Sequence, residues 1–158
     1  MRAGIGYDIH GFEEGCPLVL GGVELAGETG LAGHSDADVL LHAIIDALFG
    51  AAGLGDIGQH FPPDDPRWEA ASSLDLLART LALVREAGFE VGNVDATVIA
   101  ERPRLAPHLA AMRERIAEVL GIDAARVNVK ATTNEGIDAI GRGEGIAAMA
   151  VAVVRELA

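Results

Sequence analysis

The sequence is poor in cysteine, in aromatic residues and in positive charge. Cys16 is the only cysteine, so no disulfide can form within the chain and nothing points to an oxidising compartment. Aromatic residues make up only 4% of the chain, so Ala, Val, Leu and Ile must build the core. Twelve Lys and Arg stand against 24 Asp and Glu, and the resulting net charge of −12 disfavours nucleic acids and anionic membranes as partners.

Long hydrophobic runs are also missing. The longest apolar stretch, 146–154, is far too short to span a bilayer. The first residues, Met1-Arg2-Ala3-Gly4, lack the apolar run of a signal peptide. We therefore expect a cytoplasmic protein without a membrane partner. The chain has 158 residues, of which half are hydrophobic and 23% are charged, so we expect one packed domain spanning residues 1–158.

Hydrophobic patterns and turn signals predict the elements. Two short strands, 18–20 and 23–25, flank Gly21-Gly22 as in a hairpin. A helix is expected to begin at Ser35 as N-cap, with Asp38 three residues on. The other expected elements are strand 5–10, loop 55–65, helix 72–88, strand 91–99, helix 107–120, strand 127–133, loop 134–145 and strand 146–154.

The last strand, 146–154, has no polar alternation, which is typical of a strand buried on both faces. Three helices can cover one face of a sheet of this size, so the other face needs a partner. A second copy of the chain is the simplest partner, and we expect a homo-oligomer whose sheets face each other. The alternative is a central strand with a helix on either side. The expected fold is α+β, with a mixed four- to five-stranded sheet and helices on one face.

Asp8, His10 and His42 are candidate metal ligands. Residues two apart on a strand point the same way, so Asp8 and His10 share a face. A carboxylate and two imidazoles suit Zn²⁺ with one position open. Asp38 and Asp46 lie one helical turn to either side of His42, and either could orient its second nitrogen. The alternative is a chance Asp-x-His pattern and a surface histidine.

Other segments could bind anions or polyols. His34 and Ser35 lie at the expected helix start, where backbone N–H groups attract a phosphate, although Ser35 could simply cap the helix. The loop 55–65 could wrap a polyol or be an ordinary connection. Glu135, after the hydroxyls of Thr132 and Thr133, could hold Mg²⁺ with substrate phosphates or be solvated. The glycines around Arg142 would let it approach an anion or form a flexible turn with an Arg–Glu pair.

Together these segments resemble the family of 2-C-methyl-D-erythritol 2,4-cyclodiphosphate synthases, enzymes of the non-mevalonate isoprenoid pathway. The resemblance covers nearly the whole chain, in order. Its segments are Gly6–His10, His34–Asp38 with His42 and Asp46, Leu54–Gly58, Asn93–Asp95, Val127–Thr133 with Glu135, and Gly141–Gly145.

The resemblance implies a phosphorus–oxygen lyase. Its substrate would be 4-diphosphocytidyl-2-C-methyl-D-erythritol 2-phosphate, whose 2-phosphate attacks the β-phosphorus, closes a cyclic diphosphate and expels CMP. It also implies a homotrimer, with sheets packed together and active sites between neighbouring subunits. Zn²⁺ would bind Asp8, His10 and His42, and Mg²⁺ or Mn²⁺ would bind Glu135 together with the substrate phosphates.

The resemblance further implies roles for individual residues. His34 and Thr133 would stabilise the transition state. The erythritol part would be held by Asp56, Ile57, Gly58, Phe61, Pro62, Pro63, Asp64 and Asp65. The cytidine pocket would be formed by Ala100, Glu101, Arg102, Pro103, Arg104, Leu105, Ala106 and Thr132. The remaining substrate contacts would come from Asp8, His10, Ser35, Asn134, Glu135, Ala139 and Arg142.

Two positions depart from the family pattern. Arg104 stands where lysine is frequent, which keeps the charge but changes its geometry. Ala139 stands where an aromatic residue is common, which bears on any hydrophobic cavity, and any prenyl diphosphate, at the trimer axis. Two other functions remain open: a zinc-dependent phosphohydrolase using the same ligands, and a non-catalytic trimer that binds a nucleotide or metal. Hydrolysis would release phosphate or a linear fragment, whereas cyclisation releases CMP.

Overall fold

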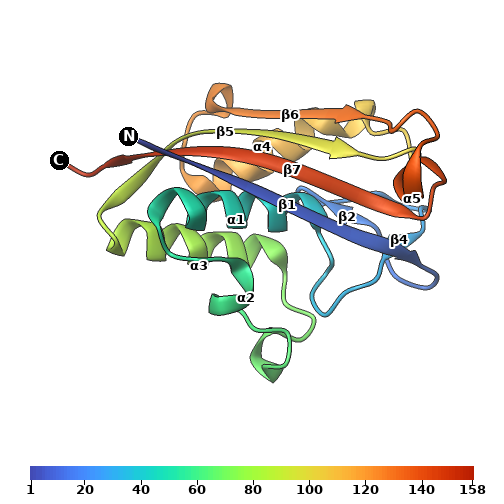
Figure 1. The fold of residues 1–158 in the computed structure, drawn as a ribbon, viewed down its shortest axis with the longest axis horizontal. Helices are drawn as coiled ribbons and strands as arrows, with labels where there is room; N and C mark the ends of the chain where they lie inside the picture. The colour runs from blue at the N-terminus through green and yellow to red at the C-terminus, as the bar shows by residue number, and fades with distance from the viewer.

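A five-stranded mixed sheet organises the chain, and the computed structural model describes all of residues 1–158 (Figure 1). The sheet order is β4-β1-β7-β5-β6. Only β5 and β6 are parallel, and every other pair in the sheet is antiparallel. The strands are β1 (Arg2–Glu13), β2 (Val19–Leu20), β3 (Val23–Glu24), β4 (Gly30–Leu31), β5 (Phe89–Ile99), β6 (Val127–Thr132) and β7 (Gly145–Glu156).

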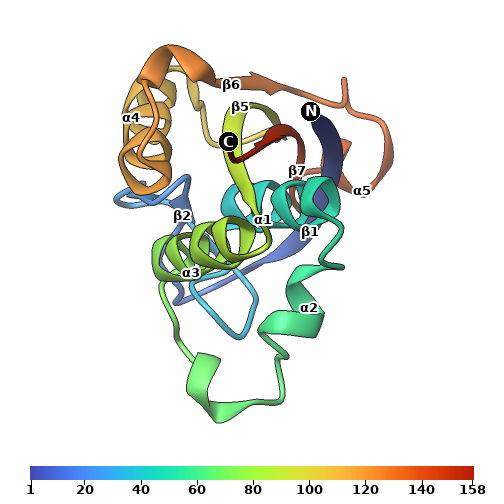
Figure 2. The same cartoon turned by 90° about the vertical axis from the view of Figure 1, so that its left-hand side faces the viewer.

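The three long helices lie on one side of this sheet (Figure 2). The α-helices are α1 (Val39–Ala52), α2 (Ile57–His60), α3 (Ser73–Glu86), α4 (Leu109–Leu120) and α5 (Asp138–Gly141). Short 3₁₀ turns occur at η1 (Pro66–Trp68), η2 (Ala106–His108) and η3 (Ala124–Arg126). The α+β prediction of a mixed sheet with helices on one face is confirmed for the long helices. The one-turn helix α5 is an exception, because Ala139 shares a cavity with Tyr7 and Met149 on the opposite face.

Helix α1 lies against β1 at unusually close range. A Cβ atom at Gly6 would come within 1.8 Å of the carbonyl oxygen of Ala43, and one at Gly4 within 2.1 Å of that of Ala47. Glycine at both positions therefore lets the helix backbone approach the strand. The predicted apolar stripe of the helix, which includes Leu41 and Leu48, is fully buried in the core. This contact fixes α1, and with it His42, relative to the even-numbered face of β1.

The start of α1 corrects a sequence prediction. The helix begins at Val39, and its N-cap is Asp38, whose carboxylate accepts the N–H of Leu41 at 3.0 Å. Ser35 is not the cap, because Ala37 has a φ of 53° and interrupts any helix starting earlier. Asp38 also accepts the N–H groups of Gly21 and Gly22 at 2.9 and 2.7 Å. It thereby joins the helix start to the predicted β2–β3 hairpin, which is confirmed.

Other boundaries also differ from the sequence prediction. The expected loop 55–65 contains α2, and the expected loop 134–145 contains α5. Helix 107–120 opens with the 3₁₀ turn η2 before α4 begins at Leu109. Strands β1, β5 and β7 are each longer than expected. All these differences extend or subdivide predicted segments without changing their order.

In the single chain the last strand is buried on one face only, so the expected burial of its other face requires a partner copy. The alternative of a central strand with a helix on either side is wrong. Residues of β7 that point toward the helices are buried, but Met149 and Val151 are 44% and 43% exposed. They pair across the sheet with Tyr7 and Ile5, which are 53% and 66% exposed. These residues form an apolar face on the side of the sheet away from the long helices. None of the helices has the length and apolar character that crossing a membrane would require.

Candidate metal centre and its pocket

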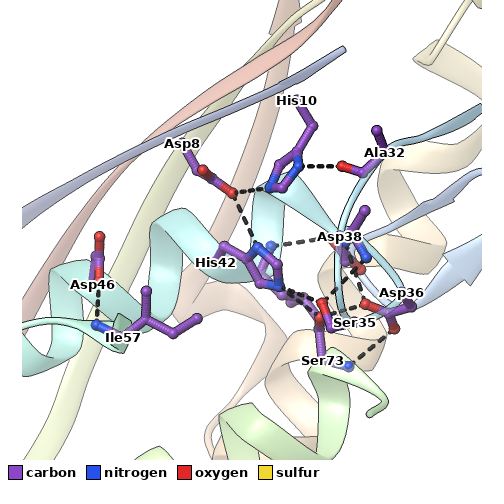
Figure 3. A network of polar contacts seen from close by, with 12 residues as sticks. Asp8, His10, Ala32, Ser35, Asp36, Asp38, His42, Asp46, Ile57 and Ser73 are labelled. Carbon is purple, nitrogen blue, oxygen red and sulfur yellow. Dashed lines mark hydrogen bonds and ion pairs between the residues drawn. The ribbon is translucent and has the colours of Figure 1, made fainter. Parts of the chain in front are cut away.

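Asp8, His10 and His42 converge at the end of the α1–β1 interface (Figure 3). Asp8 and His10 share the face of β1 that Gly4 and Gly6 turn toward α1, and His42 reaches them from the first turns of α1. Asp8 Oδ2 lies 2.9 Å from His10 Nε2 and 3.0 Å from His42 Nδ1. One possible ligand atom from each residue lies within 4.8 Å of the others. This carboxylate and two imidazoles form a cluster able to bind a metal ion.

The electrostatics of the cluster favour a charged carboxylate. Burial by itself would raise the pKa of Asp8, but the hydrogen bonds from His10 and His42 outweigh it and lower the pKa to about 2. The hydrogen bond to Asp8 raises the pKa of His10 above its ordinary value. Because the side chains of Asp8, His10 and His42 are only 26%, 21% and 12% exposed, solvent screens the Asp8 carboxylate weakly. It would attract a divalent cation.

The far side of each imidazole is also occupied. His10 Nδ1–H donates to the carbonyl oxygen of Ala32 at 2.6 Å. His42 Nε2 lies 2.9 Å from Ser73 Oγ and 3.2 Å from Ser35 Oγ. Sequence reasoning missed Ser73, which is the first residue of α3 and gives no local signal of a role beside a histidine.

Asp38 and Asp46 do not orient His42, contrary to the sequence prediction. Asp38 is buried at the start of α1, where its carboxylate accepts hydrogen bonds from backbone N–H groups of the hairpin and of the helix. Burial raises its pKa to about 6. Asp46 accepts the N–H of Ile57 at 2.7 Å, and burial raises its pKa as well. Residues four positions before and four positions after His42 could have faced it along the helix. Both carboxylates instead find backbone donors outside α1.

A cavity of about 240 Å³ opens beside the cluster. It contains several residues expected to contact substrate, together with Trp68 and Leu76, which sequence reasoning missed. Trp68 packs edge-on against Phe61 at 5.0 Å between centroids, and its buried Nε1–H has no protein partner. The lining residues are His10, His34, Ser35, His42, Ile57, Gly58, Phe61, Pro63, Trp68 and Leu76.

Four of the residues expected around the erythritol group do not line this cavity: Asp56, Pro62, Asp64 and Asp65. Asp56 caps α2 by accepting the N–H of Gln59 at 3.0 Å. Asp65 is bound by the guanidinium of Arg67, with Nη2 at 2.6 Å from Oδ2. These carboxylates shape the segment that borders the cavity.

The expected cytidine segment forms a separate pocket of about 310 Å³. Glu101, which lines this pocket, accepts a hydrogen bond from the backbone N–H of Asn134 at 2.9 Å. Arg102 turns away, and its guanidinium lies 4.5 Å from the centre of the Phe12 ring. The lining residues are Ala100, Glu101, Pro103, Arg104, Leu105, Ala106, Ala131, Thr132 and Thr133. The two pockets share no lining residue within one chain.

The other predicted residues lie near the second pocket or on the exposed face of the sheet. Glu135 is exposed, has a φ of 52°, and its N–H donates to Thr133 Oγ1 at 3.2 Å. Arg142 pairs with Glu144 at 2.6 Å, as the alternative interpretation of the glycine-rich turn expected. Ala139 lines a third cavity, of about 380 Å³, on the apolar face.

Comparison with known proteins finds matches that span nearly the whole chain. A model of the YgbB family matches residues 1–155. The 2-C-methyl-D-erythritol 2,4-cyclodiphosphate synthase of Symbiobacterium thermophilum is 60% identical over 154 residues, covering 98% of each chain. The synthase of the same name from Desulfosudis oleivorans is 61% identical over 156 residues, covering 99% of this chain and 93% of the relative.

Solved structures with related names also superpose on nearly the whole chain. The bifunctional IspDF of Campylobacter jejuni superposes with a TM-score of 0.95 at 44% identity, over 99% of this chain and 42% of that larger chain. The CDP complex of IspF from Plasmodium falciparum superposes with a TM-score of 0.85 at 32% identity, over 99% of this chain and 97% of that one.

Proposed function

The chain belongs to the YgbB family, among the 2-C-methyl-D-erythritol 2,4-cyclodiphosphate synthases, and we propose that residues 1–158 act as one catalytic domain with that activity. It converts 4-diphosphocytidyl-2-C-methyl-D-erythritol 2-phosphate to 2-C-methyl-D-erythritol 2,4-cyclodiphosphate and CMP, a step of non-mevalonate isoprenoid biosynthesis. The observation that carries this function is the convergence of Asp8, His10 and His42 beside the cavity that contains His34 and Ser35.

The ligand atoms fit Zn²⁺ at this cluster, because one carboxylate and two imidazoles leave a coordination position for a phosphate oxygen. Glu135, exposed beside the second pocket, would hold Mg²⁺ or Mn²⁺ together with the substrate phosphates. When bound, these cations polarise the phosphates and neutralise the charge that develops on the CMP leaving group.

The side chains around the cavity orient the reacting groups. In the reaction, an oxygen of the 2-phosphate forms a bond to the β-phosphorus, and the bond from that phosphorus to the oxygen bridging it to the α-phosphate breaks, so CMP leaves with that oxygen. His34 and Thr133 donate hydrogen bonds to the phosphoryl oxygens as charge shifts. Ile57, Gly58 and Phe61 enclose the erythritol part and exclude water.

Two features support a homotrimer with active sites between subunits. The metal-side cavity and the cytidine pocket have no residue in common within one chain, so one substrate that spans both could use pockets from neighbouring copies. One face of the sheet exposes five large apolar side chains next to one another, and exposed apolar patches of this kind mark interaction surfaces. They are Ile5, Tyr7, Ile9, Met149 and Val151. Packing this face against the same sheet of other copies would cover it.

Phosphorus NMR of the purified protein with the cytidyl substrate tests the function. We expect CMP and a cyclic diphosphate to appear in equal amounts, with no inorganic phosphate. Appearance of phosphate or a linear phosphorylated erythritol would identify hydrolysis instead. Unchanged substrate in the presence of both Zn²⁺ and Mg²⁺ would contradict catalysis altogether.

A further inference from the structure

The contacts of Ser73 extend the metal centre beyond its three candidate ligands. Ser73 begins α3 and is fully buried. Its hydroxyl oxygen lies 2.9 Å from His42 Nε2, on the side of the ring opposite Asp8. Asp36, in the segment before α1, bonds both the hydroxyl and the backbone N–H of Ser73 (Figure 3).

The direction of these hydrogen bonds follows from the number of protons available. An ionised carboxylate only accepts, so the single hydroxyl proton of Ser73 points at Asp36 Oδ1. The backbone N–H of Ser73 donates to the other oxygen, Oδ2, at 2.9 Å. Ser73 Oγ can then offer only a lone pair to His42. The short contact between Oγ and Nε2 is therefore a bond in which His42 Nε2–H donates.

We propose that Ser73, held by Asp36, is a positioning residue that fixes His42 with its proton on Nε2 and the lone pair of Nδ1 directed at the metal position. This inference deepens the proposed function, since it concerns the same centre. The carbonyl of Ala32 does the same for His10, by accepting the Nδ1–H and leaving Nε2 toward Asp8. Each imidazole thus has a hydrogen-bond acceptor on its far side that holds the far N–H in place, so a metal displaces only the proton that the near nitrogen donates to Asp8.

Ser35 is less able to set the ring. Its Oγ is farther from His42 Nε2, at 3.2 Å, and it accepts a bond from the N–H of Ala37. It also lines the cavity, where its hydroxyl can turn to a ligand. Ser73 lies outside that lining and is buried, so its hydroxyl has no partner other than Asp36 and His42.

Asp36 additionally locates α3. The N-cap Ser72 makes no side-chain hydrogen bond, and the first helical N–H, that of Ser73, is taken by Asp36 instead. The N–H of Asp36 in turn donates to the carbonyl of Ala71 at 3.3 Å. The segment before α1 and the start of α3 therefore hold each other, and the hydroxyl of Ser73 is delivered to His42 by backbone contacts.

The test compares Ser73→Ala with Ser72→Ala, a neighbouring serine without a side-chain bond. Loss of such an outer contact typically weakens metal binding by about 10- to 100-fold. We expect that loss of Zn²⁺ affinity, measured by competition with a chelator, in Ser73→Ala and not in Ser72→Ala. Equal affinity of folded Ser73→Ala and wild type would overturn the proposal. Neither measurement uses turnover, so an absence of CMP formation would count against the proposed function alone.

A spectroscopic measurement separates positioning from general stability. In zinc-loaded wild type, nitrogen NMR of His42 should show the metal on Nδ1 and, on Nε2, a proton that exchanges slowly with solvent. Asp36→Asn keeps an oxygen for the N–H of Ser73 but offers an amide donor to its hydroxyl, which frees the hydroxyl proton to point at His42. We expect the Nε2 proton to exchange faster with solvent in this variant, because Ser73 Oγ no longer offers it a lone pair. Zinc bound to Nε2 of wild-type His42 would overturn the proposal even if both variants failed to fold.

Discussion

The carboxylate of Asp46 accepts a 2.7 Å hydrogen bond from the backbone N–H of Ile57. Asp46 lies on α1 one turn after His42, and Ile57 opens α2 beside the cavity. Helix α1 therefore carries a candidate metal ligand and also anchors the wall proposed to hold the erythritol group. The two parts of the site share one rigid support.

Removing this anchor should weaken substrate binding without removing the metal. In Asp46→Ala the N–H of Ile57 loses its acceptor, so α2 should shift and KM should rise by about 10-fold, the loss of one hydrogen bond to a charged group. Asp46→Asn is the matched control, because its amide oxygen still accepts the bond. Steady-state kinetics and zinc analysis of both variants check this. Unchanged KM in Asp46→Ala, or loss of zinc, would contradict it.

The close approach of β1 and α1 gives a prediction about stability. An added methyl group in Gly6→Ala would meet the backbone carbonyl of Ala43, which moves only with the helix. We expect a loss of about 3 kcal/mol in the free energy of unfolding, the upper part of the usual range for overpacked cores. Gly11→Ala on the same strand is the control, since its nearest neighbour would lie at 3.7 Å. Urea unfolding at matched concentration measures both, and equal midpoints would refute the packing argument.

Much of the fold follows from patterns within the sequence, while its boundaries depend on distant contacts. Alternating residues placed Asp8 and His10 on one face, and the helical stripe of Leu41 to Leu48 identified α1. The start of α1 was misplaced because Ser35 and Asp38 are both good caps. The choice is made by the backbone of Gly21 and Gly22, which binds Asp38 from 17 and 16 positions away.

In the site, too, some residues follow from local patterns and others depend on contacts between distant parts of the chain. Residue types and spacing suggested the three candidate ligands, and the family resemblance strengthened that hypothesis. The contacts of Ser73 with His42 and Asp36 span 31 and 37 positions, so no local pattern marks them. The expected partners of His42, Asp38 and Asp46, were reasonable by helical spacing. They were wrong because backbone donors elsewhere in the chain bind both carboxylates.

Metal content provides a direct test of the cluster. We expect about one Zn²⁺ per chain in the wild type and much less in His42→Ala, because losing one of three protein ligands leaves an incomplete site. His108→Ala, which alters a histidine at the start of α4, should keep its zinc. Elemental analysis of the three purified proteins gives the result. Equal zinc in His42→Ala and wild type would remove His42 from the ligand set.

The exposed apolar face predicts the oligomeric state. Light scattering at low micromolar concentration should give three times the 16.3 kDa mass of the chain. Val151→Glu places a charge opposite Ile5 on this face and should shift the mass toward the monomer. Leu157→Glu, beyond the end of β7, should not. A stable wild-type monomer would contradict both the trimer and an active site shared between subunits.

Glu135 distinguishes cyclisation on two cations from hydrolysis on one. Glu135→Gln removes a charge and keeps the shape of the side chain, so a cation on the CMP side loses its protein ligand. Turnover should fall by roughly 10²-fold, as is common when charge stabilisation of a transition state is lost. Zinc content should not change, and excess Mg²⁺ should restore part of the activity because the substrate phosphates still bind it weakly. Glu118→Gln on α4 is the control for a lost surface charge. Near-normal turnover with a normal magnesium dependence in Glu135→Gln would show that this carboxylate is only part of a turn.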